Sequence, residues 1–242
     1  MSDPGRFRTT HWSVVLTAGG DDPDARTALA TLCTTYWYPL YAFARRRGQG
    51  PDDASDLVQG FLCDLLEKGW VKHADEQRGR FRGFLSTAFR RYAGRVHEKA
   101  HTQRRGGGIT VLTFDAEEGE SRYAREPQDD RTPEQVFDRR WALTIIDRAL
   151  SKVRAQYVRR ARGSDFEALA PHLDGTSPAP PYSETARQMQ STEGAVKVAV
   201  HRLRKRFGET LREEVGATVD TDQDVDAEIQ ELLTALARGK GS

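Results

Sequence analysis

This sequence of 242 residues is short of cysteine, of alternating strand patterns and of long apolar runs. Its two cysteines, Cys33 and Cys63, stand far apart and outside any CxxC grouping, so we expect small packing residues, not a disulfide or a zinc site. The chain has no stretch of about 18 apolar residues that would predict a membrane span. It also lacks a charged-then-apolar secretory signal, so we expect a cytoplasmic protein without a membrane partner. Helical periodicity accounts for most of the chain and predicts an all-α fold.

Composition bounds the size of the core and the placement of charge. With 37% apolar and 30% charged residues, the chain fits a soluble helical protein of one large domain or two small ones. The net charge of +1 conceals strong segregation. Residues 78–105 carry nine Arg or Lys against Glu98 alone, whereas residues 115–138 carry nine acids against three arginines. Basic and acidic functions are therefore expected on different parts of the chain.

Three amphipathic helices are predicted in the first part of the chain, at residues 25–47, 53–67 and 81–101. Gly48 is expected to end the first of them, and Pro39 to kink it. The aromatic residues of the third helix have the spacing of a core stripe, so most of these rings should pack inward. The residues predicted to face the core are Leu29, Leu32, Cys33, Tyr36, Leu40, Phe43, Ala54, Leu57, Val58, Phe61, Leu62, Leu65, Leu66, Phe81, Leu85, Phe89, Tyr92 and Val96.

A flexible acidic linker is predicted at residues 106–131, because three glycines and an aperiodic stretch follow the third helix. Thr132 then supplies an N-cap, Pro133 the first helical position and Gln135 a capping-box partner. The helix that follows should bury one face and end at Gly163; that face holds Phe137, Trp141, Ile145, Ala149 and Val153. The predicted division is an N-terminal extension with a short helix (1–24), two small helical domains (25–105 and 132–216) joined by the linker, and an acidic helical extension (217–242).

Residues 183–215 predict a helix-turn-helix: a short helix, a tight turn and a longer basic helix. In the longer helix an apolar stripe recurs every three or four residues, from Val196 to Val215. Between Val196 and Arg206 there are five Lys or Arg and no acid, as expected of an element that meets phosphates. Ser191 or Thr192 can cap its N-terminus. The alternative is an amphipathic surface helix with solvated charges.

Three motifs, in this order, resemble the extracytoplasmic-function group of bacterial RNA polymerase sigma factors. They are DASDLVQGFLCDLLE at residues 53–67, RGRFRGFLSTAFRRY at 78–92 and TEGAVKVAVHRLRKRF at 192–207. The resemblance covers about residues 25–215. It implies a protein that is not an enzyme, needs no cofactor or metal, binds core RNA polymerase and directs it to promoter DNA. An anti-sigma factor or a Ser/Thr kinase would be possible regulatory partners.

The resemblance assigns roles to particular positions. Residues 53–67 would dock on a coiled coil of the largest polymerase subunit through Asp53, Asp56 and Gln59. Residues 78–105 would melt and read the minus-ten element through Arg82, Arg90, Arg91 and Arg95. The loop at residues 69–79, with Trp70, Lys72 and His73, would hold a flipped base of the same element. The helix-turn-helix would read the minus-thirty-five element through Arg187, Thr192, Lys197, His201, Arg202 and Lys205.

The sequence departs from the family pattern at three positions. Ser55 stands where a third acid is usual, and Gly60 stands where a Glu is usual, which should weaken polymerase docking. We hypothesise that phosphorylation of Ser55 restores the missing charge. Equal polymerase affinity of Ser55→Ala and Ser55→Glu proteins would contradict this. In the tight turn, Gln190 replaces the usual Gly, so the turn is either strained or differently shaped.

Two other functions remain open from the residues. His97, Glu98 and His101 spell HExxH, the pattern of a zinc metalloprotease helix, although the flanking arginines and glycines are atypical of one. A helix-turn-helix regulator that acts without polymerase is the nearer alternative.

The C-terminal extension predicts an acidic amphipathic helix from about Thr221 or Asp224. We expect its apolar side to pack within the chain and hypothesise that its acids mask a basic DNA surface. That side holds Val225, Ile229, Leu232, Leu233 and Leu236.

Overall fold

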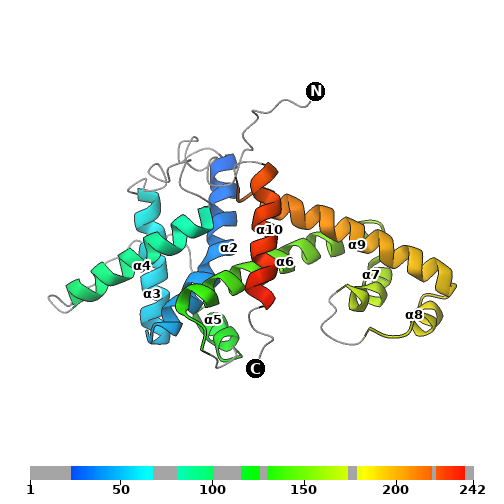
Figure 1. Cartoon of the computed structure of the whole chain (residues 1–242), viewed down its shortest axis with the longest axis horizontal. Helices are drawn as coiled ribbons and strands as arrows, with labels where there is room; N and C mark the ends of the chain where they lie inside the picture. The colour runs from blue at the N-terminus through cyan, green and yellow to red at the C-terminus, as the bar shows by residue number, and fades with distance from the viewer. Residues whose placement is uncertain are drawn as a thin grey trace. The chain divides into compact units, whose positions relative to one another are not determined.

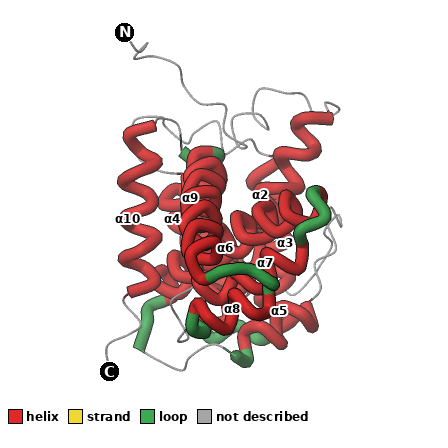
Figure 2. Tube along the Cα trace, turned by 90° about the vertical axis from the view of Figure 1, so that its right-hand side faces the viewer, coloured by secondary structure: helices red, strands yellow, loops and turns green. Residues whose placement is uncertain are grey.

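The computed structural model describes residues 23–67, 81–100, 116–125, 130–173, 179–219 and 222–237. Within these ranges all regular structure is helical, which confirms the all-α prediction (Figures 1 and 2). None of the described helices is long and apolar enough to span a membrane. The elements are α2 (Pro23–Arg46), α3 (Pro51–Glu67), α4 (Phe81–Ala100), α5 (Ala116–Tyr123), α6 (Pro133–Arg159), α7 (Gly163–Leu169), the 3-10 turn η2 (Ala170–His172), α8 (Tyr182–Gln188), α9 (Glu193–Gly216) and α10 (Asp222–Ala237).

The chain forms two compact units, 1–144 with 216–242, and 145–215. The division falls inside α6, at a different place from the predicted linker. The predicted short helix of the N-terminal extension and the three glycines at 106–108 lie outside the described residues.

Aromatic rings fill the core that α2, α3 and α4 share in the first unit. Phe89 of α4 meets Phe43 of α2 and Phe61 of α3 in edge-to-face geometry, with ring centroids 5.5 and 5.1 Å apart. Phe81 packs on Tyr36 in the same way. The predicted inward face of α4 is therefore confirmed at its first three turns. It is wrong at Val96, which is 37% exposed because the last turns of α4 lie beyond this core.

Helix ends follow their local signals in two predicted places. Gly48 takes φ +88° after the last residue of α2, a conformation that glycine adopts without a steric penalty, so its predicted role is confirmed. At the start of α6, the Thr132 amide donates to Gln135 Oε1 at 3.0 Å and the Gln135 amide donates to Thr132 Oγ1 at 3.3 Å. This is the predicted capping box.

The far end of α6 differs from the prediction. The helix ends at Arg159, and Ala161 takes the left-handed conformation with φ 55°. Gly163 instead begins α7. The Arg162 amide donates to the Tyr157 carbonyl at 2.9 Å, which closes the helix end four residues earlier than glycine placement suggested. The predicted buried face of α6 is confirmed at all five positions: Phe137, Trp141, Ile145, Ala149 and Val153.

Part of the predicted flexible linker is ordered, which corrects the sequence analysis. Residues 116–123 form α5, which packs on α2 and α3. Its carboxylate Glu120 accepts hydrogen bonds from Tyr41 at 2.8 Å and from Arg45 at 2.8 and 2.9 Å. Gly119 lies so close to Trp37 that a Cβ there would stand 2.7 Å from the ring. Tertiary contacts therefore order a segment whose composition alone suggested a linker.

In the second unit, α7, α8 and α9 enclose a separate small core with the end of α6. It consists of Val153, Phe166, Leu169, Ala186, Val196, Val200 and Leu203. Glu214 of α9 is also buried in this unit and pairs with Arg148 at 2.8 Å and with Lys152. Burial would raise the pKa of Glu214, but the hydrogen bonds from Lys152 and Arg148 outweigh it and lower the pKa.

The predicted C-terminal helix is α10, and it packs within the first unit. Val225 and Leu232 are buried, whereas Leu233, also predicted to face inward, is 52% exposed. Consecutive residues of a helix point about 100° apart, and here Leu233 lies on the outer side of α10. Glu228 on the same helix, one of the acids hypothesised to mask a basic surface, is buried.

Candidate nucleic-acid interface

The predicted DNA-contacting face of α9 is exposed. Thr192 precedes the helix and its Oγ1 accepts a hydrogen bond from the Ala195 amide at 3.2 Å, so Thr192 is the cap. Val196, Val200 and Leu203 lie in the core and fix the helix rotation. The opposite face and the end of α8 therefore carry the predicted contacts, all of them exposed: Arg187, Thr192, Lys197, His201, Arg202 and Lys205.

A buried histidine links η2 to α8 and α9 behind this face. His172 stacks on Tyr182 with ring centroids 4.9 Å apart, and its Nε2 lies 3.0 Å from Thr185 Oγ1. Arg204 donates to the His172 carbonyl at 2.9 and 3.3 Å. Burial, and secondarily the charge of Arg204, lowers the pKa of His172. The sequence analysis missed this histidine, which has no signal in the helical pattern, and it counted Arg204 among the basic residues of the DNA-facing side.

The turn between α8 and α9 has the strained conformation that the sequence raised as one of two possibilities. Gln190 has φ 50°. The Met189 amide donates to the Thr185 carbonyl and the Ser191 amide to the Ala186 carbonyl, both at 2.9 Å. These bonds close the end of α8 around a residue that glycine would fit with less strain.

The predicted polymerase-docking side of α3 is partly exposed. Asp53 and Asp56 are exposed, whereas Gln59 and Ser55 are half-buried. The residues that hold α3 in the core are Ala54, Leu57, Val58, Phe61, Leu62 and Leu65. Gly60 faces the hydroxyl of Tyr92 on α4, a close approach that the sequence did not reveal.

The predicted minus-ten residues of α4 divide into two groups. Arg90, Arg91 and Arg95 are exposed, and Arg90 lies 3.8 Å from Glu134 of α6. Arg82 is instead 8% exposed, so its guanidinium does not lie on an open DNA-binding surface as expected. Trp70, Lys72 and His73 lie outside the described residues.

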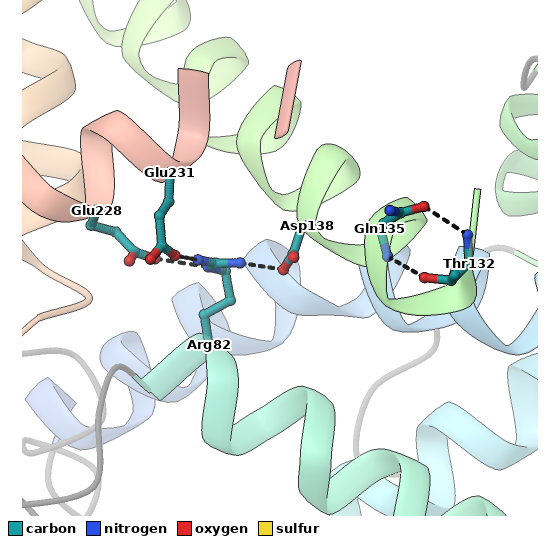
Figure 3. A network of polar contacts seen from close by, with 6 residues as sticks. All are labelled: Arg82, Thr132, Gln135, Asp138, Glu228 and Glu231. Atoms are coloured by element: carbon teal, nitrogen blue, oxygen red, sulfur yellow. Dashed lines mark hydrogen bonds and ion pairs between the residues drawn. The ribbon is translucent and has the colours of Figure 1, made fainter. Parts of the chain in front are cut away.

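Arg82 is surrounded by carboxylates from two other helices (Figure 3). It pairs with Glu228 of α10 at 2.8 Å, with Glu231 of α10 at 2.5 Å and with Asp138 of α6. Its guanidinium also lies 4.9 Å from the centre of the Trp141 ring. Burial alone would lower the pKa of Arg82, but the bonds to Glu228 and Asp138 outweigh it, and the pKa is raised.

The HExxH pattern remains a sequence observation. His97 is exposed near the end of α4, whereas the side chain of Glu98 and the whole of His101 lie outside what is described. In the described ranges no three His, Cys, Asp or Glu gather in a way that could hold a metal ion.

Comparison with family models, with curated proteins and with solved structures gives no match for this chain.

Proposed function

We propose that this chain is a sigma factor: a cytoplasmic, dissociable subunit that binds core RNA polymerase and directs it to promoter DNA. The exposed basic face of α9 carries the proposal. Its buried residues hold it in one rotation, and four cations or histidines of its outer side face solvent: Lys197, His201, Arg202 and Lys205. A helix with this surface fits the major groove, where phosphates attract the charge and base edges meet the leading turn.

The polymerase partner is inferred from α3. Asp53 and Asp56 present exposed carboxylates at the start of a helix whose other side is buried, so the acids are held on a rigid support. Such a surface suits a basic partner such as the coiled coil of the largest polymerase subunit. Exposed Arg90, Arg91 and Arg95 on α4 would contact promoter phosphates near the minus-ten element.

Titration of the purified chain with core RNA polymerase tests the proposal. We expect tight binding that Asp56→Arg weakens about tenfold, because charge reversal places a cation against a basic partner. Glu213→Arg is the matched control, since Glu213 is an exposed acid near the end of α9. The proposal fails if polymerase does not bind, or if both variants change the affinity equally.

Promoter-library transcription with the reconstituted polymerase then tests the DNA side. New start sites that Arg202→Ala abolishes, and that Arg159→Ala leaves in place, support recognition by α9. Both arginines are exposed, and Arg159 is the last residue of α6, outside the helix-turn-helix. Binding to duplex DNA at moderate salt without any polymerase binding would favour the polymerase-independent regulator.

A further inference from the structure

The contact between α10 and Arg82 joins two helices of opposite charge in the first unit. α10 contains five acids and no Lys or Arg, whereas α4 contains five Lys or Arg and one acid. Glu228 and Glu231 of α10 bind the guanidinium of Arg82, at the start of α4. Further along α4, Arg90 and Arg91 are exposed, so the rest of this helix presents cations to solvent.

We propose that Arg82 is a phosphate-binding residue that α10 masks, so that α10 competes with the DNA backbone for it. The inference rests on the proposed DNA-binding function and adds its regulation. Carboxylates and phosphodiesters bind the planar fork of a guanidinium in the same way, through parallel N–H donors. Glu228 takes the Nε donor and Glu231 an Nη donor, so α10 occupies the donors that a phosphate needs.

The charge balance at Arg82 favours masking over simple stabilisation. Three carboxylates surround the Arg82 guanidinium, and Arg131 lines the same cavity, so among these groups the acids outnumber the cations. Without the two glutamates of α10, Asp138 is the one of these acids that remains, and the cations outnumber it. Burial of the Glu228 carboxylate carries a desolvation cost, which offsets part of its attraction to Arg82. Glu228 is 1% exposed, so its desolvation is nearly complete.

The cluster is open to a competing ion. A polar cavity of about 280 Å³ lies beside it, lined by Arg82, Asp138 and Glu231 together with Arg131, Gln135, Thr234 and Ala235. On α10 the apolar side chains of Val225 and Leu232 are buried, whereas that of Leu233 is exposed. A dense array of phosphates such as a DNA duplex can therefore displace the carboxylates where dilute anions cannot.

The test compares duplex binding by the full-length chain and by the double variant Glu228→Gln with Glu231→Gln. Fluorescence anisotropy of a labelled duplex, measured from about 50 to 300 mM KCl, gives the affinity and its salt dependence. We expect the variant to bind roughly fivefold more tightly at low salt, with a log–log salt slope steeper by about 0.9, the value for one added phosphate contact. Adding Arg82→Gln to the double variant should cancel both the increase in affinity and the increase in salt slope.

Glu117→Gln with Glu118→Gln is the matched control, because it removes the same charge from exposed positions on α5. Deleting residues 220–242 should raise the affinity as the double variant does. The inference is overturned if the double variant binds like wild type, if the α5 control gains as much, or if the gain survives Arg82→Gln. Binding of core RNA polymerase is measured without DNA. A failure of the masking inference, seen in duplex binding, is therefore distinguishable from a failure of the proposed sigma-factor function.

Discussion

The hydroxyl of Tyr92 on α4 stands 2.6 Å from the point that a Cβ on Gly60 of α3 would occupy. The Tyr92 ring packs on Phe61 with centroids 5.5 Å apart, so it has little freedom to retreat. Glycine at this position is therefore a consequence of helix packing. A larger side chain here would have to displace Tyr92.

We expect Gly60→Ala to lower the free energy of unfolding by about 1 kcal/mol, because overpacking outweighs the gain in helix propensity. In a Tyr92→Phe background the hydroxyl is gone and the next ring atom lies 3.7 Å away, an ordinary contact. There the same substitution should stabilise the protein by about 1 kcal/mol. Urea denaturation of the four proteins measures the coupling; an equal effect of Gly60→Ala in both backgrounds would contradict the packing argument.

Gln190→Gly should raise the free energy of unfolding by about 0.5–1 kcal/mol, because glycine adopts the left-handed conformation of this turn without strain. Gln188→Gly is the matched control: the same change within α8 should lower stability by a similar amount. Thermal unfolding of both variants checks the opposite signs. Destabilisation by both would show that the turn of the protein in solution does not need a positive φ.

The stability of the second unit should fall as the pH drops below about 6.5. Burial lowers the pKa of His172 in the folded state, whereas the unfolded chain titrates near 6.5, so the unfolded state takes up protons first. The loss begins near the unfolded pKa and continues down to the folded pKa. Urea midpoints between about pH 7.5 and 5 should shift less in His172→Gln, while exposed His201→Gln should behave like wild type.

Glu120→Gln should loosen α5. It weakens the bonds from Arg45 and Tyr41, by about 1 kcal/mol because the carboxylate is one-third exposed. Trypsin cleavage after Arg122 should then become about fivefold faster, since cleavage follows the population of the open form. Glu117→Gln, on the exposed side of the same helix, serves as the control. Equal cleavage rates in both variants would argue that the Glu120 cluster does not hold α5.

Residue spacing along the chain predicts the helices and the buried side of most of them. Thr132 and Gln135 cap α6 as predicted, and the stripe from Phe137 to Val153 is buried as predicted. Gly48 ends α2, and Thr192 caps α9. These features depend on residues within about one helical turn of each other, so they are readable from spacing alone.

Which charged groups are exposed and which are bound depends instead on contacts between helices that are far apart in the sequence. Arg45 meets Glu120 across 75 residues of sequence, and Arg82 meets Glu228 across 146. The first contact orders α5 within a predicted linker, and the second withdraws a predicted DNA contact into a buried cluster. Gly60 and the hydroxyl of Tyr92 likewise lie close together only because α3 packs on α4. No local sequence period predicts such pairs, because they depend on which helices pack against each other when their apolar faces are buried.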